Sequence, residues 1–140
     1  MVRYLKGFLV TLICFSCIIS LVSCKGGIKT DEAKSFISDF FDAVEAAEYD
    51  RAMTFLHPER PTELEPFFQG IENETGVDFQ QGIEVERYTN FRYAYYDSTV
   101  DGSAYESTIR TDVGGHTVIF TVEIVQNDNG YGIYNLDVDT

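Results

Sequence analysis

Histidine and cysteine, the residues that most often carry catalysis or bind metal ions, are scarce in most of this chain. His57 and His116 are the only two histidines, and the three cysteines all lie within the first 24 residues. His57 directly precedes a proline, and His116 follows Gly114-Gly115 in an expected turn. Because neither histidine has a cysteine at metal-ligand spacing, we expect structural or solvated imidazoles and no zinc site.

The spacing of the carboxylates matches a calcium-binding loop only in part. Asp97, Asp101 and Gly102 would take the first, fifth and sixth positions of such a loop, but Thr108 stands where a bidentate glutamate is needed. An Asp-Gly pair between two apolar runs is a hairpin signal, so we predict a turn here. The sequence as a whole predicts no catalytic residue, no metal ligand and no cofactor-binding residue.

Tyrosine is the one plentiful side chain that could do chemistry. The chain has nine, and seven lie in its second half: Tyr88, Tyr93, Tyr95, Tyr96, Tyr105, Tyr131 and Tyr134. Tyrosine is favoured in strands for its packing alone, which is the simpler interpretation. The alternative is a pocket or surface on which the phenol groups contact a ligand or a partner.

The cysteines belong to an N-terminus that has the plan of an export signal. Arg3 and Lys6 are followed by an uncharged stretch over residues 7–23. Cys14 and Cys17 lie inside this apolar stretch, which is not the folded setting of a redox motif. An uncleaved signal anchor is the alternative, although the stretch is at the lower length limit for spanning a bilayer.

The stretch ends in Leu21-Val22-Ser23-Cys24, which resembles the lipobox of bacterial lipoproteins. The resemblance implies that residues 1–23 are a removed signal peptide and that Cys24 is the site of lipid attachment, carrying a thioether-linked diacylglycerol. The expected partner is therefore the membrane, reached through the lipid anchor at Cys24. The expected location is the extracytoplasmic side of the cell envelope, with the inner and outer membranes both open.

The charge of the chain is strongly unbalanced. Eight of the ten basic residues and all 23 acidic residues follow Cys24, so the side chains of the mature part carry a formal net charge of −15. Such a surface repels phosphate backbones, which argues against a nucleic-acid partner. We expect residues 24–30 to comprise the lipidated cysteine and a short tether, and residues 31–140 to form a single domain.

Helices are expected in the first half of this domain. Thr30 is the predicted cap of a helix whose apolar residues recur at steps of three and four: Ala33, Phe36, Ile37, Phe40, Phe41, Val44 and Ala47. Asp50 is the predicted cap of a shorter helix that Pro58 ends. Thr62 and Glu65 have the spacing of a capping box for a third helix, which Gly76 would stop.

From residue 77 onward the apolar period changes to two, which indicates strands. A long first strand is expected to bend near Asn90, and turns are expected at residues 101–102, 114–115 and 127–130. The last two strands are expected to direct these residues to the inner face, against the first helix: Val118, Phe120, Val122, Ile124, Tyr134, Leu136 and Val138. The sequence thus predicts an α+β fold, with N-terminal helices packed on an antiparallel sheet of about four strands.

Three stretches of the helical half carry a second resemblance. Residues 33–41, the run Ala46-Ala47-Glu48-Tyr49-Asp50-Arg51-Ala52 and Leu56-His57-Pro58 resemble the opening of nuclear transport factor 2-like domains. The resemblance implies a cystatin-like roll over residues 31–140, in which a curved sheet wraps around the helices. That family includes isomerases, dehydratases, ligand-binding modules and interaction domains, so its fold alone does not give a function.

The favoured hypothesis is a membrane-anchored lipoprotein whose domain binds a small ligand or an unidentified envelope protein without catalysis or a cofactor. The alternative is an isomerase- or dehydratase-like enzyme that uses the interior of the roll. A third hypothesis is an accessory or inhibitory protein that binds through the outer sheet face. A buried carboxylate in an interior pocket would favour the enzyme, and Glu84, Glu86 and Asp97 are the acids that could turn inward. An interior plugged by aromatic rings would favour the binding module.

Overall fold

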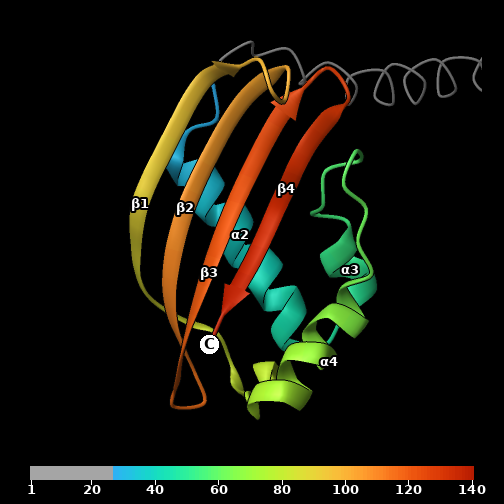
Figure 1. Ribbon diagram of the computed structural model, residues 1–140, viewed down its shortest axis with the longest axis vertical. Helices are drawn as coiled ribbons and strands as arrows, with labels where there is room; N and C mark the ends of the chain where they lie inside the picture. Colours follow the sequence, from blue (N-terminus) through green and yellow to red (C-terminus); the bar gives the residue numbers. More distant parts are fainter. Residues whose placement is uncertain (1–26) are drawn as a thin grey trace, which may run out of the picture.

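The computed structural model describes residues 27–140, which form helices followed by a curved, open, four-stranded antiparallel sheet (Figure 1). The predicted α+β class is confirmed. The expected signal peptide and Cys24 lie outside the described residues. Within the described part of the chain, no helix has the length and apolar character needed to cross a membrane.

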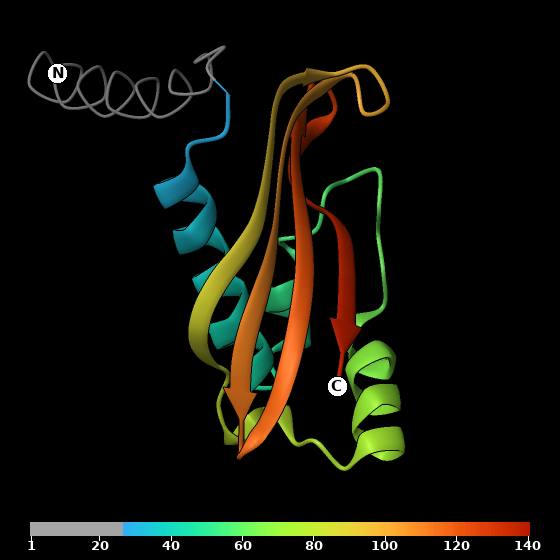
Figure 2. The same cartoon turned by 60° about the vertical axis from the view of Figure 1, so that its left-hand side comes forward.

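The helices are α2 (Thr30–Glu45), α3 (Tyr49–Met53) and α4 (Leu64–Thr75), and a 3-10 turn, η1 (Phe79–Gln81), leads into the sheet. The strands are β1 (Glu84–Asp97), β2 (Gly102–Val113), β3 (His116–Asn127) and β4 (Gly130–Asp139), and they lie side by side in chain order. Helix α2 crosses one face of the sheet, the inner face, whereas α3 and α4 lie beside the edge strand β4 (Figures 1 and 2).

The core lies between α2 and the inner face, as the two apolar patterns predict. Ile37, Phe40 and Phe41 of α2 are buried in one cluster with Val118, Phe120, Val122 and Ile124 of β3, and Phe36, Leu136 and Val138 pack against it. Ile28, which the sequence placed in the tether, is also buried in this cluster. The helix therefore buries a continuous apolar stripe, which is what stabilises an amphipathic helix of this length.

The helix starts differ from their predicted caps. Helix α2 begins at Thr30 itself, so Lys29, and not Thr30, takes the cap position. The side chain of Lys29 makes no capping hydrogen bond, and its Nζ pairs with Oε1 of Glu32 at 3.0 Å. Helix α4 begins at Leu64 with Glu63 as its cap, and Glu63 makes no side-chain capping bond. The predicted capping box of Thr62 and Glu65 is therefore wrong, whereas Gly76 ends α4 in the left-handed conformation, as predicted.

The second helix is shorter than predicted, because the chain after it pairs with the sheet. Helix α3 starts at Tyr49, before the predicted cap Asp50, and ends at Met53. The N–H of Ile133 donates to the carbonyl of Phe55, and the N–H of His57 donates to the carbonyl of Ile133, both at 2.8 Å. Pairing with β4 thus ends the helix before Pro58, and tertiary contacts override the local helical pattern.

Strand β1 is interrupted where the sequence predicted a bend. Its pairing with β2 shifts register between Val85 and Arg87, between Thr89 and Arg92, and between Ala94 and Asp97. Asn90 lies in the middle shift and has a φ of +50°, a conformation that asparagine tolerates better than most residues. An extra residue at each shift bends an edge strand and breaks its regular ladder of backbone groups.

Strand β4 contains one further shift, and it corrects a prediction. Ile124 pairs with Ile133, but the preceding Glu123 pairs with Asn135, so Tyr134 is the extra residue. Ile133 therefore enters the inner core, whereas Tyr134 packs with Val125 in a small cluster apart from that core. The predicted inward orientation of Tyr134 is wrong, because one inserted residue reverses the alternation that the sequence pattern assumes.

Candidate functional site

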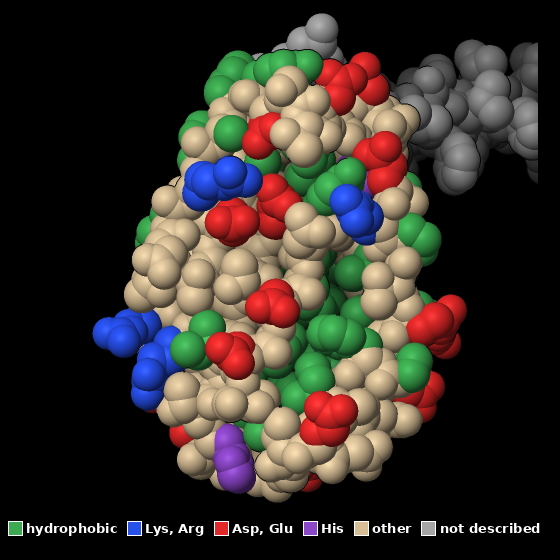
Figure 3. Space-filling view, viewed as in Figure 1, with side chains coloured by type: hydrophobic (Ala, Val, Ile, Leu, Met, Phe, Trp, Pro, Cys, Tyr) green, Lys and Arg blue, Asp and Glu red, His purple; other side chains and the backbone are tan. Residues whose placement is uncertain are grey.

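An open groove runs between strand β4 and the chain that leads into α4. Residues 133–136 form one wall, and the other is formed by Leu56, Arg60, Pro61, Thr62, Leu64 and Phe67. We call this hollow, of about 280 Å³, the β4 groove. Figure 3 shows hydrophobic side chains in a depression to the right of the sheet, where β4 faces this chain segment. An apolar concave surface with a few polar groups is the usual form of a binding site.

The strand wall of the groove is a sheet edge. Strand β4 is the last strand of the sheet and pairs with β3 on one side. On its other side, the one backbone pairing among the described residues is the isolated bridge between Leu56 and Ile133. Beyond this bridge, residues 134–136 line the groove, and no strand within residues 27–140 pairs with them on that side. A sheet edge presents backbone N–H and C=O groups, to which an extended segment can pair.

Arg60 supplies the positive charge of the groove. Its guanidinium lies over the ring of Tyr134, 4.5 Å from the ring centre, and both residues line the groove. A cation above an aromatic face is attracted by the negative charge density of the ring. The groove therefore combines apolar walls, a sheet edge and one oriented cation.

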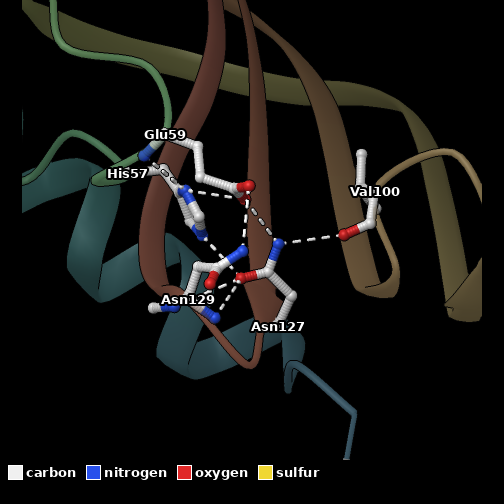
Figure 4. Close-up of polar contacts among 6 residues, drawn as sticks. His57, Glu59, Val100, Asn127 and Asn129 are labelled. Carbon is white, nitrogen blue, oxygen red and sulfur yellow. Dashed lines mark hydrogen bonds and ion pairs between the residues drawn. The ribbon is translucent and has the colours of Figure 1, made fainter.

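His57, which lies in the chain between the wall residues Leu56 and Arg60, is fully buried and hydrogen-bonded through both ring nitrogens (Figure 4). The backbone N–H of Glu59 donates to Nδ1 at 3.2 Å, and Nε2 lies 3.1 Å from Oδ1 of Asn127. Since Nδ1 accepts this hydrogen bond, we assign the proton of the neutral imidazole to Nε2, which donates a hydrogen bond to Oδ1 of Asn127. His57 therefore holds the segment before the groove wall residue Arg60 against Asn127, and both of its ring nitrogens are used within the protein.

Asn127 links three segments through the same network. Its Nδ2 donates to the carboxylate of Glu59 at 2.7 Å and to the carbonyl of Val100 at 2.9 Å. Its Oδ1 also accepts the N–H groups of Asn129 and Gly130 in the turn between β3 and β4. The network holds residues 57–59 against the end of the sheet, and it thereby helps to position the wall residues on either side, Leu56 and Arg60.

Comparison with known protein families, curated proteins and solved structures finds no match to this chain.

The space between α2 and the sheet is filled by aromatic rings. The rings of Phe41 and Phe120 lie 4.7 Å apart, those of Phe79 and Phe120 lie 6.1 Å apart, and those of Phe68 and Phe79 lie 4.9 Å apart. These four side chains are buried. An active site inside the roll would hold its substrate in this space between α2 and the inner face, and the aromatic rings fill that space.

A buried carboxylate does exist, but it lies on the outer face of the sheet. Glu123 is flanked by Arg92, 3.5 Å away, and by the side-chain amide of Asn135. Both oxygens of this carboxylate therefore face a donor, Oε1 the guanidinium of Arg92 and Oε2 the amide of Asn135. Sequence reasoning missed this pair, because the alternation of β3 gives no sign that an outward-facing glutamate is covered.

The other predicted residues lie apart from the groove. His116 is exposed at the start of β3, and Glu84 and Glu86 are exposed on β1. Asp97 accepts the N–H of Thr99 at 2.8 Å in the β1–β2 turn, and this bond lowers the pKa of its carboxyl. Across residues 27–140, no three His, Cys, Asp or Glu side chains gather closely enough to hold a metal ion.

The tyrosines divide between packing and exposure. Tyr105 is buried in the core, and burial raises the pKa of its phenol. Tyr93, Tyr95 and Tyr96 of β1 are exposed, and Tyr96 donates to Asp101 at 2.6 Å. Of the seven tyrosines in the second half of the chain, only Tyr134 lines the β4 groove.

Proposed function

We propose that this chain is an extracytoplasmic lipoprotein, anchored through a diacylglycerol on Cys24, whose domain binds a ligand or an envelope partner without catalysis. The anchor is supported by Leu21-Val22-Ser23-Cys24, which closes a basic and then apolar leader. Two acyl chains on one cysteine anchor a protein stably, whereas a single chain gives reversible attachment.

The observation that carries the binding role is the β4 groove. In one hollow it offers a stretch of sheet edge that no other described strand pairs with, apolar side chains from α4 and the guanidinium of Arg60. These features suit an extended segment or a small apolar anion, because each part of such a ligand meets a matching group.

The packing of the interior supports binding over catalysis. An isomerase- or dehydratase-like enzyme needs a general base in an apolar pocket, where burial raises its pKa toward the working pH. The space under the sheet holds Phe41, Phe79 and Phe120 instead, and the buried Glu123 lies on the other face beside Arg92.

The cystatin-like roll is part of the same proposal. It is supported by the order of elements, with a long first helix across the inner face of a curved antiparallel sheet (Figure 2). The nuclear transport factor 2-like resemblance of residues 33–58 agrees with that order.

Site-specific crosslinking in intact cells tests the binding role. The photoreactive residue p-benzoylphenylalanine replaces Thr62, which is exposed in the groove, and in a matched control it replaces Thr117, which is exposed at the start of β3. We expect a discrete adduct from position 62 and none from position 117. A large mass increase identifies a protein partner, and a small one identifies a small ligand.

The same experiment with Arg60→Ala separates specific binding from chance encounters. Loss of the position-62 adduct in this variant supports the groove as the site, because Arg60 supplies its only oriented cation among the described lining residues. Equal adducts from positions 62 and 117, or an adduct that Arg60→Ala leaves unchanged, would refute the proposal.

A further inference from the structure

The large apolar side chains that are exposed in residues 27–140 gather at one end of the molecule. They are 37% to 63% exposed, and they comprise Phe91, Tyr93, Tyr95 and Tyr96 of β1 and Tyr131 of β4. The last part of β1 and the first part of β4 lie at the same end of the sheet in both views (Figures 1 and 2). We call this surface the aromatic end. Single exposed aromatic rings are ordinary, but a cluster of them marks a contact surface.

The aromatic end is exposed because α2 starts too late to cover it. Lys34, in the second turn of α2, reaches over the rings of Tyr88 and Phe91, 4.8 and 5.3 Å from their centres. Of the described chain before α2, residues 27–29 extend further along the sheet than the helix does (Figure 1). Among them, the backbone of Gly27 lies so close to Tyr93 that a Cβ on Gly27 would be 1.6 Å from the phenol oxygen.

This contact places the start of the described chain on the aromatic end. Cys24 is three residues before Gly27, and consecutive Cα atoms are about 3.8 Å apart, so the Cα atoms of Cys24 and Gly27 can be separated by at most about 11 Å. A lipid on Cys24 would therefore bring the bilayer surface to the aromatic rings. It would leave the β2–β3 turn, at the other end of the sheet, furthest from the membrane (Figure 1).

The residue types at this end suit a lipid interface. Tyrosine rings are enriched at membrane–water boundaries, where the ring meets the apolar region and the hydroxyl meets water or headgroups. Three of the eight basic residues that follow Cys24, namely Lys25, Lys29 and Lys34, fall within ten residues of it. Asp31 and Glu32 lie in the same stretch, so the contact depends on the aromatic rings more than on charge.

We propose that the aromatic end rests on the phospholipid bilayer, with Phe91, Tyr93 and Tyr95 inserted at the level of the headgroups. This inference depends on the lipid anchor of the proposed function. The acyl chains hold the domain near the membrane, and the aromatic end fixes which way the domain faces.

The absence of tryptophan from the chain makes a direct test possible. Tyr95→Trp places a single fluorescent reporter in the aromatic end, and His116→Trp places a matched reporter at the exposed β2–β3 turn. Each full-length lipidated chain is reconstituted in phosphatidylcholine vesicles that contain lipids brominated in the upper acyl region. We expect the reporter of Tyr95→Trp to be quenched several-fold more strongly than the reporter of His116→Trp.

The mass of each purified chain separates the two proposals. A chain without the added diacylglycerol refutes the lipid anchor itself. A lipidated chain whose Tyr95→Trp reporter is quenched no more than that of His116→Trp refutes only the contact between the aromatic end and the bilayer. Strong and equal quenching at both positions also refutes it, because the domain would then lie along the membrane.

Discussion

Asn127 shows how much of the groove depends on one side chain. Its amide oxygen accepts from His57 and from the turn between β3 and β4, and its amide nitrogen donates to Glu59 and to Val100. Nothing in the sequence distinguishes this residue from an ordinary turn asparagine, because its partners lie far away along the chain. The fully satisfied network is what allows an imidazole to be buried at this position.

We therefore expect Asn127→Ala to lower the free energy of unfolding by about 1–3 kcal/mol, because it leaves Nε2 of the buried His57 without a partner. Asn129→Ala is the matched control. The side chain of Asn129 donates only to Glu59 and is exposed, so its loss should cost less than about 0.5 kcal/mol. Urea unfolding of both variants measures the difference, and equal costs would contradict the positioning role of His57.

The phenol of Tyr131 leads to a prediction of how the free energy of unfolding changes at high pH. Its ring, although 37% exposed, packs against Phe36, and this partial burial, with a further contribution from the charge of Glu32, raises the pKa of its phenol to about 12. The phenol titrates near 10 in the unfolded chain, so its contribution is complete below pH 10 and is lost as the pH rises from 10 toward 12.

Tyr131→Phe removes this titration while it keeps the ring. We expect the variant to unfold at a higher pH than the parent chain when circular dichroism follows an alkaline titration. Tyr95→Phe, at an exposed phenol, serves as the control and should leave the alkaline midpoint unchanged. A midpoint for Tyr131→Phe that equals that of the parent chain would show that other groups set the alkaline limit.

At the scale of elements, the stripe of α2 and the alternation of β3 were sufficient to predict the core. Ile37, Phe40 and Phe120 are buried where their periods place them. Strand order could also be predicted, because each turn is short and joins neighbours. The end of α3 and the orientation of Tyr134 could not, because both depend on how β4 pairs with residues distant in the chain. The β4 groove follows from that pairing, and so it too has no signal in the local sequence.

The core leads to a prediction for α2. Phe40 is fully buried against Phe55 and Phe68, so Phe40→Ala should destabilise the chain by about 3–5 kcal/mol, through lost burial and a remaining cavity. Phe91→Ala makes the same change at a ring that is half exposed and should cost under about 1 kcal/mol. Thermal unfolding of the two variants compares them. Similar losses would place Phe40 outside the core.

Helix α4 offers two glycines in opposite environments. A Cβ on Gly70 meets no atom within 4 Å, so Gly70→Ala should stabilise the chain by about 0.5–1 kcal/mol, because it reduces the freedom of the unfolded backbone. Gly76 ends the helix with a φ of +77°, so Gly76→Ala should destabilise it by about 1 kcal/mol. Chemical denaturation measures both, and the same sign for the two substitutions would contradict the assigned end of α4.

At the scale of the whole molecule, the two proposed contact surfaces lie on different parts of the domain. The aromatic end adjoins Gly27, and the β4 groove lies along the side of the sheet (Figures 1 and 3). A domain standing on its aromatic end would hold the groove open to the side, accessible to a neighbour on the same membrane. The acidic surface would keep the rest of the domain away from anionic headgroups.

Cys24→Ser tests the anchor on which this arrangement depends. We expect the variant to lose incorporation of labelled fatty acid and its lipoprotein-type processing, because the lipobox resemblance places both the lipid and the new N-terminus at this cysteine. Cys17→Ser is the control and should be labelled and processed like the parent chain. Fatty-acid labelling that survives Cys24→Ser would rule out this attachment site.

The register shifts of β1 have a consequence for crowding. Molecules that share a bilayer through lipid anchors diffuse in two dimensions, and their effective concentration is far higher than that of the same number in solution. Under such conditions a long, regular edge strand would act as a template for polymerisation. Strand β1 breaks its ladder three times, including at Asn90, so it provides no long uniform edge to a second copy. With the proposed anchor, the broken ladder of β1 would therefore work against pairing between neighbouring copies along this edge.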